Sequence, residues 1–317
     1  MEIGRGQDDP LLRCQLIRSP DKVTVSQGES ACPAVAQRLI RGLPQGGFDA
    51  SALAFLGDVR WLTLDCLMAI TNSTRIHDLP RLTRFSFGVH GFDDPAFLEK
   101  LDLTRITYLR LSETAKRNLD LAPLAGALRL EEFSVQGHSR NIEVIAGLPA
   151  LHTVGLSGFP NRKGLGFLNA LEALRCLRLI LGSRTSIGEF HHPGLEVLEI
   201  IRVRGLEDVG ALARFPRLHD LLIEDQVQLR AIDVAGARLR RLRLFNCKSL
   251  ESIAGLASLQ DLIECRLGRV KLDLDVLVEA DWPKSLEVLA LHTESRTWND
   301  RTREALDRRG FREFALR

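Results

Sequence analysis

Two short stretches contain residue types that could do chemistry. "VGLSG" at 154–158 holds a serine beside glycine, but it lacks the G-x-S-x-G pattern of a nucleophile elbow. "GLGFLN" at 164–169 begins like a dinucleotide-binding loop, but it lacks the final glycine and precedes no long helix. Neither stretch predicts a catalytic or a cofactor site, so we expect no cofactor.

The histidines give no catalytic or metal constellation either. His191 and His192 are adjacent in "EFHHPG", and adjacent histidines in a loop are usually solvated and not metal ligands. His152, His219 and His292 come from separate segments and are too far apart for one triad. The sequence therefore predicts no metal site and a protein that is not an enzyme.

The six cysteines are dispersed, without a CxxC pair or a zinc-type spacing. The amino terminus, "MEIGRGQDDPLLRCQL", lacks the apolar stretch of a secretory signal, and no apolar run reaches the roughly 18 residues of a membrane span. These features favour reduced thiols, a cytoplasmic location and no membrane association.

The most basic stretch is "LRRLRLFN" at 239–246, which suggests a nucleic-acid patch. The whole chain is nearly neutral, however, with 43 basic and 41 acidic residues and a net charge of +2. Nucleic-acid binders usually carry a clear basic excess. Only seven of the basic residues are lysines, a bias that is typical of a GC-rich, bacterial genome.

The leucines of the same stretch follow the spacing L-x-x-L-x-L-x-x-C, which recurs along the chain. Twelve copies begin 21 to 25 residues apart. They are "VRWLTLDC" at 59, "LTRFSFGV" at 82, "ITYLRLSE" at 106, "LEEFSVQG" at 130, "LHTVGLSG" at 151, "LRCLRLIL" at 174, "LEVLEIIR" at 195, "LHDLLIED" at 218, "LRRLRLFN" at 239, "LIECRLGR" at 262, "LEVLALHT" at 286 and "FREFALR" at 311. The chain over 59–317 resembles the leucine-rich repeat family, of the bacterial type.

The resemblance implies an α/β leucine-rich repeat solenoid with a concave parallel β-sheet and short helical or irregular convex segments. Positions 1, 4 and 6 of each copy would point inward, and positions 2, 3, 5, 7 and 8 would lie on the open side of a short strand. One such strand cannot bury its own apolar edge, so neighbouring copies must stack to build a continuous core.

Residues 1–58 are expected to cap the amino-terminal end of the solenoid, which occupies 59–317. The segment 11–28 reads as a β-hairpin and 31–44 as a short amphipathic helix. On the convex side, 93–101 and 297–310 are the clearest helices, with Asp94 and Thr297 as expected amino-terminal caps. The segments 206–215 and 250–259 read as short helical or 3₁₀ turns.

Residues at the same position of successive copies become direct neighbours in a parallel ladder about 4.8 Å apart. Such a column pairs Arg175 with Glu196 at position 2 and Arg178 with Glu199 at position 5. At position 3 it aligns Asp220, Arg241 and Glu264. Much of the charge on this face is therefore expected to be neutralised internally.

Arg243 and Arg266 are an exception, because both fall at position 5 and only Leu222 and Ala290 flank them in that column. Four apolar residues occupy positions 7 and 8 nearby, where solvent favours polar side chains: Ile180, Leu181, Ile201 and Phe245. An alternative for Ile180, Leu181 and Ile201 is that they merely cover the ends of the strands under a loop. Apolar anchors beside unpaired arginines are typical of an interface core.

The predicted partner-binding set is Arg243, Arg266, Phe245, Ile180, Leu181, Ile201, Leu222, Arg240 and Arg269. It favours a non-catalytic scaffold whose concave face binds a protein partner with an acidic, partly apolar surface. An immunity or regulatory protein of a bacterium is one role that fits. The alternative is a nucleic-acid or other polyanion binder that uses the arginines, which the near-zero net charge and the acidic residues of the same face oppose.

Overall fold

The computed structural model describes residues 13–19, 22–27, 30–31, 48–51, 59–66, 70–92, 94–114 and 118–313. The helix predicted over 31–44 lies outside these residues except for residue 31, and so does the end of the last copy, 314–317. The chain forms two compact units, 1–151 and 152–317, and each is described by itself.

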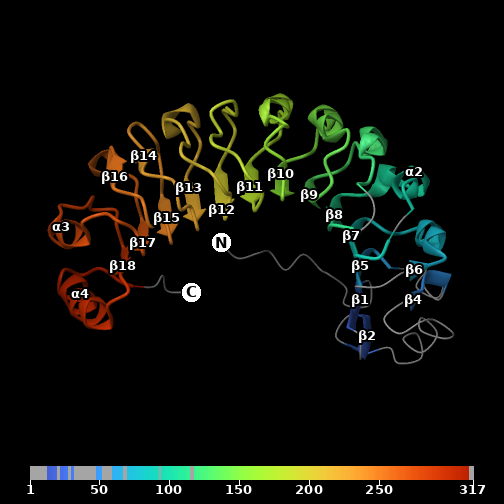
Figure 1. The fold of residues 1–317 in the computed structure, drawn as a ribbon, viewed down its shortest axis with the longest axis horizontal. Coiled ribbons are helices and arrows are strands. Elements are labelled where there is room, and N and C mark those ends of the chain that lie inside the picture. The colour runs from blue at the N-terminus through green and yellow to red at the C-terminus, as the bar shows by residue number, and fades with distance from the viewer. Residues whose placement is uncertain are drawn as a thin grey trace. The chain divides into compact units, whose positions relative to one another are not determined.

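The sheet of the first unit is mostly parallel (Figure 1). β1 pairs in parallel with β5 and in antiparallel with β2, so a hairpin begins the sheet. The strands are β1 (Arg13–Ser19), β2 (Lys22–Gln27), β3 (Ser30–Ala31), β5 (Trp61–Cys66), β7 (Arg84–Val89), β8 (Tyr108–Leu111) and β9 (Glu132–Gln136). β4 (Phe48–Asp49) and β6 (Ile70–Thr71) form a separate parallel pair. The division of the chain at residue 58 stays a prediction.

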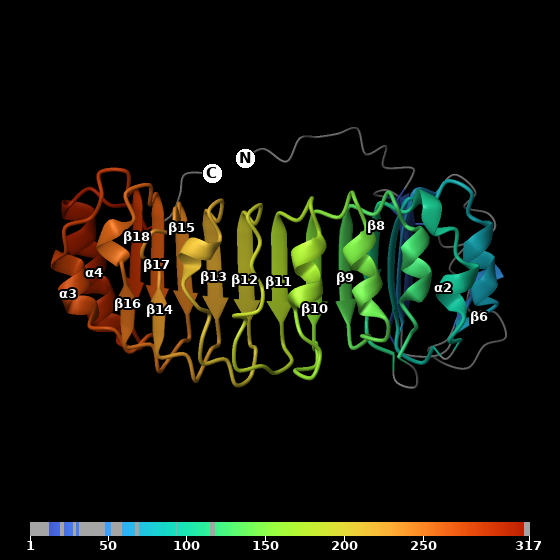
Figure 2. The same cartoon turned by 90° about the horizontal axis from the view of Figure 1, so that it is seen from above.

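The second unit contains seven parallel strands that pair in chain order, and Figure 2 shows them side by side. They are β10 (Thr153–Ser157), β11 (Cys176–Ile180), β12 (Val197–Ile201), β13 (Asp220–Glu224), β15 (Arg241–Phe245), β17 (Glu264–Gly268) and β18 (Val288–His292). Within this unit the sheet lines the inner, concave side, and the connecting segments lie outside it (Figure 1).

The outer segments are short. In the first unit they are the 3₁₀ helices η3 (Ser73–Asp78), η4 (Leu103–Arg105), η5 (Ala122–Gly126) and η6 (Ile142–Gly147), and the helix α2 (Phe97–Lys100). In the second they are η7 (Gly166–Ala170), η8 (Leu212–Arg214), η9 (Leu256–Ser258), α3 (Leu274–Glu279), α4 (Arg296–Arg308) and the parallel pair β14 (Ala231–Asp233) and β16 (Ser252–Ala254). The predicted fold class is confirmed.

The core is built from positions 1, 4 and 6, as the spacing predicts. In every copy from 59 to 286 the strand begins at position 3, and the residues at positions 1, 4 and 6 are buried. Leu239, Leu242 and Leu244 of β15 and its approach, for example, are fully buried. Burying a leucine side chain stabilises the fold by roughly 1.5–3 kcal/mol, and the stack repeats this contribution in each copy.

Position 8 is where the chain turns away from the sheet. In the second unit this position has a left-handed backbone in six successive copies, with φ between 53° and 65°. Its occupants are Gly158, Leu181, Arg202, Asp225, Asn246 and Arg269. The amide of each donates to a carbonyl of the next copy, as Asp225 N does to Phe245 O over 3.0 Å. Position 8 side chains therefore lie at the carboxyl edge of the sheet rather than on its face.

Several helix boundaries differ from those predicted. α2 has only four residues and begins after Ala96, because the carboxylate of Asp94 accepts the Ala96 amide hydrogen and forms a turn before the helix. Ser295 caps α4 instead of Thr297, and its hydroxyl accepts the Trp298 amide hydrogen. Part of the predicted turn at 250–259 is the strand β16.

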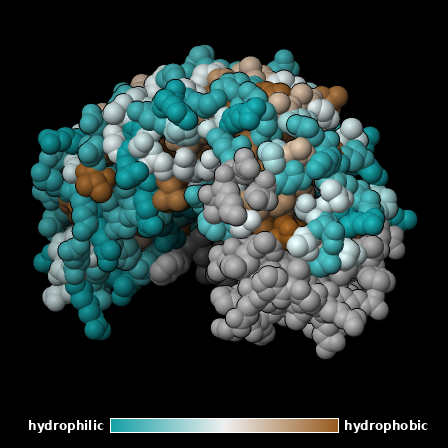
Figure 3. All heavy atoms as spheres, turned by 45° about the vertical axis from the view of Figure 1, so that its right-hand side comes forward, coloured by the Kyte–Doolittle hydropathy of each residue, from teal (hydrophilic) through white to brown (hydrophobic). Residues whose placement is uncertain are grey.

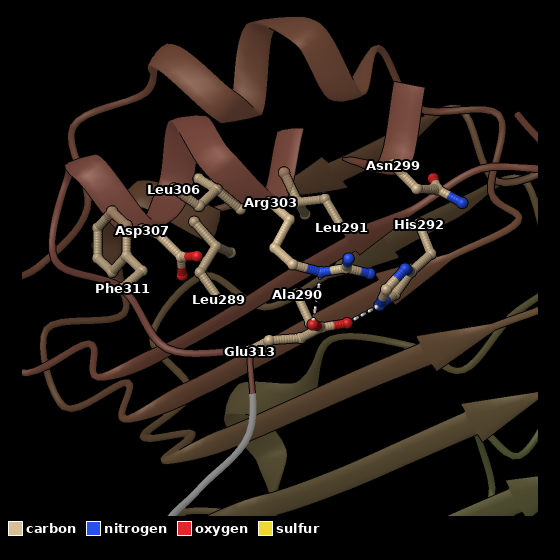
Figure 4. A pocket seen from close by; sticks show the side chains of 10 residues that line it. All are labelled: Leu289, Ala290, Leu291, His292, Asn299, Arg303, Leu306, Asp307, Phe311 and Glu313. Carbon is tan, nitrogen blue, oxygen red and sulfur yellow. Dashed lines mark hydrogen bonds and ion pairs between the residues drawn. The ribbon is translucent and has the colours of Figure 1, made fainter. Parts of the chain in front are cut away.

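The last described copy closes the carboxyl end of the second unit. Arg312 forms a single bridge with Val288 of β18, and α4 packs against that strand (Figure 4). Glu313 accepts from Arg303 Nε over 2.8 Å and lies 3.4 Å from His292 Nε2. These pairs hold the end of the chain over the apolar side chains of β18 and α4.

Candidate partner-binding surface

The strand register places the predicted charge pairs next to one another. Arg178 lies opposite Glu199, and Asp220 lies opposite Arg241. Arg178 Nε donates to Glu199 over 2.8 Å, Arg241 Nη2 lies 2.6 Å from Asp220 Oδ2, and Arg175 Nε lies 3.6 Å from Glu196. The prediction that the face neutralises much of its own charge is confirmed for these three pairs.

Arg243 and Arg266 lie opposite each other, with Leu222 and Ala290 on either side, as the column predicts. The expectation that nothing offsets their charge is wrong. Arg243 Nη2 donates to Asp220 Oδ1 over 2.7 Å, and Arg266 Nε donates to Glu264. Both acids occupy position 3, two residues from position 5. Arg243 reaches Asp220 diagonally on the neighbouring strand, whereas Arg266 reaches Glu264 along its own strand.

The charge cluster of Asp220, Arg241, Arg243, Glu264 and Arg266 nevertheless keeps an excess of one positive charge. The carboxylate of Asp220 forms ion pairs with two guanidinium groups, those of Arg241 and Arg243. The Arg243 side chain is 28% exposed and that of Arg266 is 17% exposed, so both charges are partly desolvated. The buried Nε of Arg243 has no hydrogen-bond partner. The inner face of the sheet therefore carries a local net positive charge at this cluster.

Phe245 extends the charge cluster with apolar surface. Its ring lies against Gly268 of the next strand, where a Cβ atom would come within 3.0 Å of a ring carbon. Glycine at position 7 therefore leaves room for the ring, which remains half-buried.

The other predicted apolar residues form a separate patch. Ile180 and Ile201 are neighbours on β11 and β12, but Glu224 separates them from Phe245 in the position 7 column. Leu181 is 41% exposed and lies in the left-handed turn at the carboxyl edge. The surface of the second unit that Figure 3 shows is largely hydrophilic, with separate apolar groups. On the inner face the predicted set thus divides into two groups, Arg243 and Arg266 with Leu222 and Phe245, and the isoleucine pair; Leu181 lies at the carboxyl edge.

Every copy from 59 to 286 shares one strand register and one buried L-x-x-L-x-L pattern, with a short segment returning along the outside. The fold is that of the leucine-rich repeat proteins. No protein-family model and no curated protein matches the sequence.

Solved leucine-rich repeat structures are similar in fold. An internalin of Listeria monocytogenes has 15% identity and a TM-score of 0.42, with 84% of this chain and 83% of that chain covered. A chain of the Toll–Spatzle complex of Drosophila has 18% identity and a TM-score of 0.46, with 77% and 37% covered. A leucine-rich repeat protein of Leptospira interrogans has 15% identity and a TM-score of 0.31, with 84% and 91% covered.

Arg269 and Arg240 lie at opposite edges of the leucine-rich repeat sheet, away from the charge cluster. Arg269 lines an open hollow of about 640 Å³ at the carboxyl edge, together with Asp225, Val227 and Asn246. Arg202 belongs to the same hollow and donates to Asp225 through Nε and Nη2, over 3.0 and 2.8 Å. Arg240 lines a second hollow at the amino edge.

Of the two adjacent histidines, His192 contacts the backbone of the leucine-rich repeats through its ring. His192 is buried, with Nε2 2.6 Å from Leu171 O and Nδ1 accepting from Gly194 N over 3.2 Å. Burial lowers the His192 pKa, which keeps the ring neutral. Both ring nitrogens are thus engaged by the backbone. In the described part of the chain, no group of three or more His, Cys, Asp or Glu side chains could hold a metal ion.

One notable cluster on the leucine-rich repeat face was not found from the sequence. In the first unit, the Arg84 guanidinium lies 4.7 Å from the Trp61 ring and 4.5 Å from the Tyr108 ring, and its Nη2 is 3.4 Å from Glu132. Tyr108 is the only tyrosine of the chain. The signal was available, because Trp61, Arg84 and Tyr108 all fall at position 3 of consecutive copies. Trp, Tyr and Arg are the residue types most enriched at binding hot spots.

Replacing Asp220 with asparagine is expected to destabilise the fold by about 2 kcal/mol, because it leaves the partly buried Arg243 and the more exposed Arg241 without their shared acid. Asp220 itself is only 5% exposed. The matched control is Asp225→Asn, which breaks a more exposed pair with Arg202 and should cost no more than about 1 kcal/mol. Denaturant unfolding measures both values, and equal losses would show that Asp220 is no more important than a surface acid.

Proposed function

We propose that this protein is a non-catalytic scaffold that binds a protein partner through the inner face of β13, β15 and β17. The contact surface is the charge cluster with Phe245 and Leu222, and the partner surface it fits is acidic and partly apolar. The observation that carries the proposal is the unequal pairing of the cluster: two acids pair with three arginines, of which Arg243 and Arg266 are partly desolvated, beside a half-buried aromatic ring.

Electrostatic complementarity supports a partner with a small acidic patch rather than a long polyanion. The inner face also carries Glu196, Glu199 and Glu224, and the whole chain has a net charge of only +2. A long polyanion would run past the cluster onto these acids, whereas a local carboxylate patch would meet only the arginines.

We further propose a cytoplasmic, bacterial setting and a role as an immunity or regulatory protein that holds a toxin or an enzyme. The setting is supported by the dominance of arginine over lysine and by the dispersed cysteines. No helix in the described part of the chain is long and apolar enough to cross a membrane.

Two variants test the binding surface. The double variant Arg243→Gln/Arg266→Gln and the single variant Phe245→Ala should each weaken partner binding at least tenfold, about 1.4 kcal/mol. Glutamine is chosen rather than glutamate because Asp220 and Glu264 lie beside these arginines, and a new acid there would destabilise the fold. Arg110→Gln, at position 5 of the first unit, is the matched control and should bind normally.

The measurement is capture from a lysate of the native host by the wild type and the variants, with mass spectrometry, followed by a Kd for each retained protein. A partner held by the wild type and by Arg110→Gln but lost by both test variants supports the surface. Undiminished binding by both test variants would place the contact elsewhere on the molecule. Thermal melting of each variant separates lost binding from lost folding.

A further inference from the structure

The amino edge of the sheet in the second unit carries an open hollow of about 710 Å³. Its lining residues stand in the segments just before β12, β13, β15, β17 and β18, most of them at position 2 or at the position preceding position 1. Arg217 and Arg238 occupy the preceding position of consecutive copies, and Arg240 occupies position 2. Three guanidinium groups therefore border the same open space.

These three arginines differ from those on the face. All three are exposed, and within the described part of the chain their side chains make no hydrogen bond or ion pair. By contrast, Arg175, Arg178, Arg241, Arg243 and Arg266 each contact an acid. Three like charges that border one open space repel one another, so stability does not account for this arrangement.

The acids of the hollow do not cancel the three charges. Glu196 is engaged by Arg175 Nε at 3.6 Å and lies 3.8 Å from His219 Nε2. Asp261 is the other acid of the lining. The hollow therefore keeps an excess of positive charge even when Asp261 is set against one arginine.

The positive region is short. Along position 2 the successive residues are Arg175, Glu196, His219, Arg240, Ile263 and Glu287. Glu196 and Glu287 thus bound it on its two sides, and Ile263 adds an apolar surface to its floor. Neighbouring copies lie about 4.8 Å apart, so the positive region, which extends from the copy that begins at 218 to the copy that begins at 262, is roughly 10 Å wide.

We propose that this hollow binds an extended acidic segment of a protein partner, with two carboxylate side chains facing Arg217, Arg238 and Arg240. An extended chain presents side chains on one face at every second residue, roughly 7 Å apart, so two of them fit within a positive region of roughly 10 Å. Guanidinium groups pair with carboxylates in bidentate geometry. A long nucleic acid fits less well, because its phosphates would continue past Glu196 and Glu287.

This inference rests on the proposed function for the source of the segment, but its test requires no partner. The probe is a fluorescently labelled hexaglutamate peptide, whose binding to the full-length protein is followed by fluorescence anisotropy at low salt. Wild-type binding should weaken as salt is added. The double variant Arg217→Gln/Arg238→Gln should weaken peptide binding at least tenfold. The matched control, Arg129→Gln/Arg162→Gln, removes two exposed arginines outside the hollow and should leave binding unchanged.

Three results would overturn the proposal. They are an absence of peptide binding by the wild type, an equal loss in the two double variants, and tighter binding of a single-stranded oligonucleotide of the same charge with the same dependence on Arg217 and Arg238. The last result would assign the hollow to nucleic acid. Because Arg243, Arg266 and Phe245 are unchanged in these variants, failure here leaves the proposed function standing, and the reverse also holds.

Discussion

Aspartate in place of both Leu242 and Leu244 is expected to prevent folding of the second unit. Both side chains are fully buried, at positions 4 and 6 of the same strand. Truncation of one buried leucine to alanine already costs about 2–5 kcal/mol, and an unpaired charge in the core costs more. Since whole domains are stable by only about 5–15 kcal/mol, the double variant should retain little native structure.

Circular dichroism and thermal melting measure this outcome. The control is Gln228→Asp/Gln260→Asp, which introduces two charges at exposed positions of neighbouring copies and should melt cooperatively within a few degrees of the wild type. A soluble Leu242→Asp/Leu244→Asp protein with a cooperative transition would show that the strand register is wrong.

The second large effect concerns the thiols of Cys176, Cys247 and Cys265. All three are free and buried. Burial raises the pKa of Cys247 to about 11 and that of Cys265 to about 12, from an ordinary value of 9.0. At neutral pH the reactive thiolate is therefore about 100-fold and about 1000-fold scarcer at these two sites than in a free cysteine. In the native protein we expect none of the three to react appreciably with iodoacetamide.

Peptide mapping by mass spectrometry after native and denatured labelling checks the expectation. Labelling of Cys247 or Cys265 at the rate of a small free thiol would contradict it. The side chains of Cys14, Cys32 and Cys66 lie outside the described part of the structure, and for them the sequence-based expectation of reduced thiols stays a prediction. Position 3 was predicted to lie on the open side of the strand, which would expose the Cys176 thiol, but Cys176 is buried, with Thr153 and Val197 beside it on the adjacent strands.

The same pKa values predict loss of stability in alkali. A thiol whose pKa is higher in the folded chain than in the unfolded chain keeps its proton longer in the folded state. Stability is therefore unaffected below about pH 9 and falls as the pH rises toward 11 and 12, by roughly 1.4 kcal/mol for each pH unit and each thiol. Cys247→Ala should lessen this slope, measured by denaturant unfolding at pH 8 and pH 10.5.

The sequence was sufficient for the repeat, the strand register and the core. The spacing of Leu239, Leu242 and Leu244 recurs every 21 to 25 residues and therefore indicates stacked parallel strands, because only stacking buries such a pattern. The pairs of Arg178 with Glu199 and of Arg241 with Asp220 followed from that register alone.

Side-chain reach and local capping could not be derived in the same way. Only residues at equal positions of successive copies could be compared from the sequence. The contact of Arg243 with Asp220 runs diagonally between two strands, and that of Arg266 with Glu264 runs along one strand, so neither was predicted. Leu181 was also predicted to lie on the face, whereas the left-handed turn directs position 8 to the edge. The cap of α4 falls on Ser295 because its hydroxyl reaches the Trp298 amide, a geometry that the sequence leaves open between nearby residues. The binding surface itself stays a prediction.

The constant strand register also makes each copy an exchangeable genetic unit. Excision of residues 218–238 by recombination would set β15 beside β12 in the same register, although β16 would lose its partner β14. Glu199 would then lie opposite Arg243, in place of Leu222, and Arg241 would lose Asp220 and face Val197. A duplication of the same copy would instead set one Asp220 beside another. Gain or loss of a whole copy therefore changes which charged residues are neighbours on the face. The leucines at positions 1, 4 and 6 remain buried, because the strands on either side keep the same register.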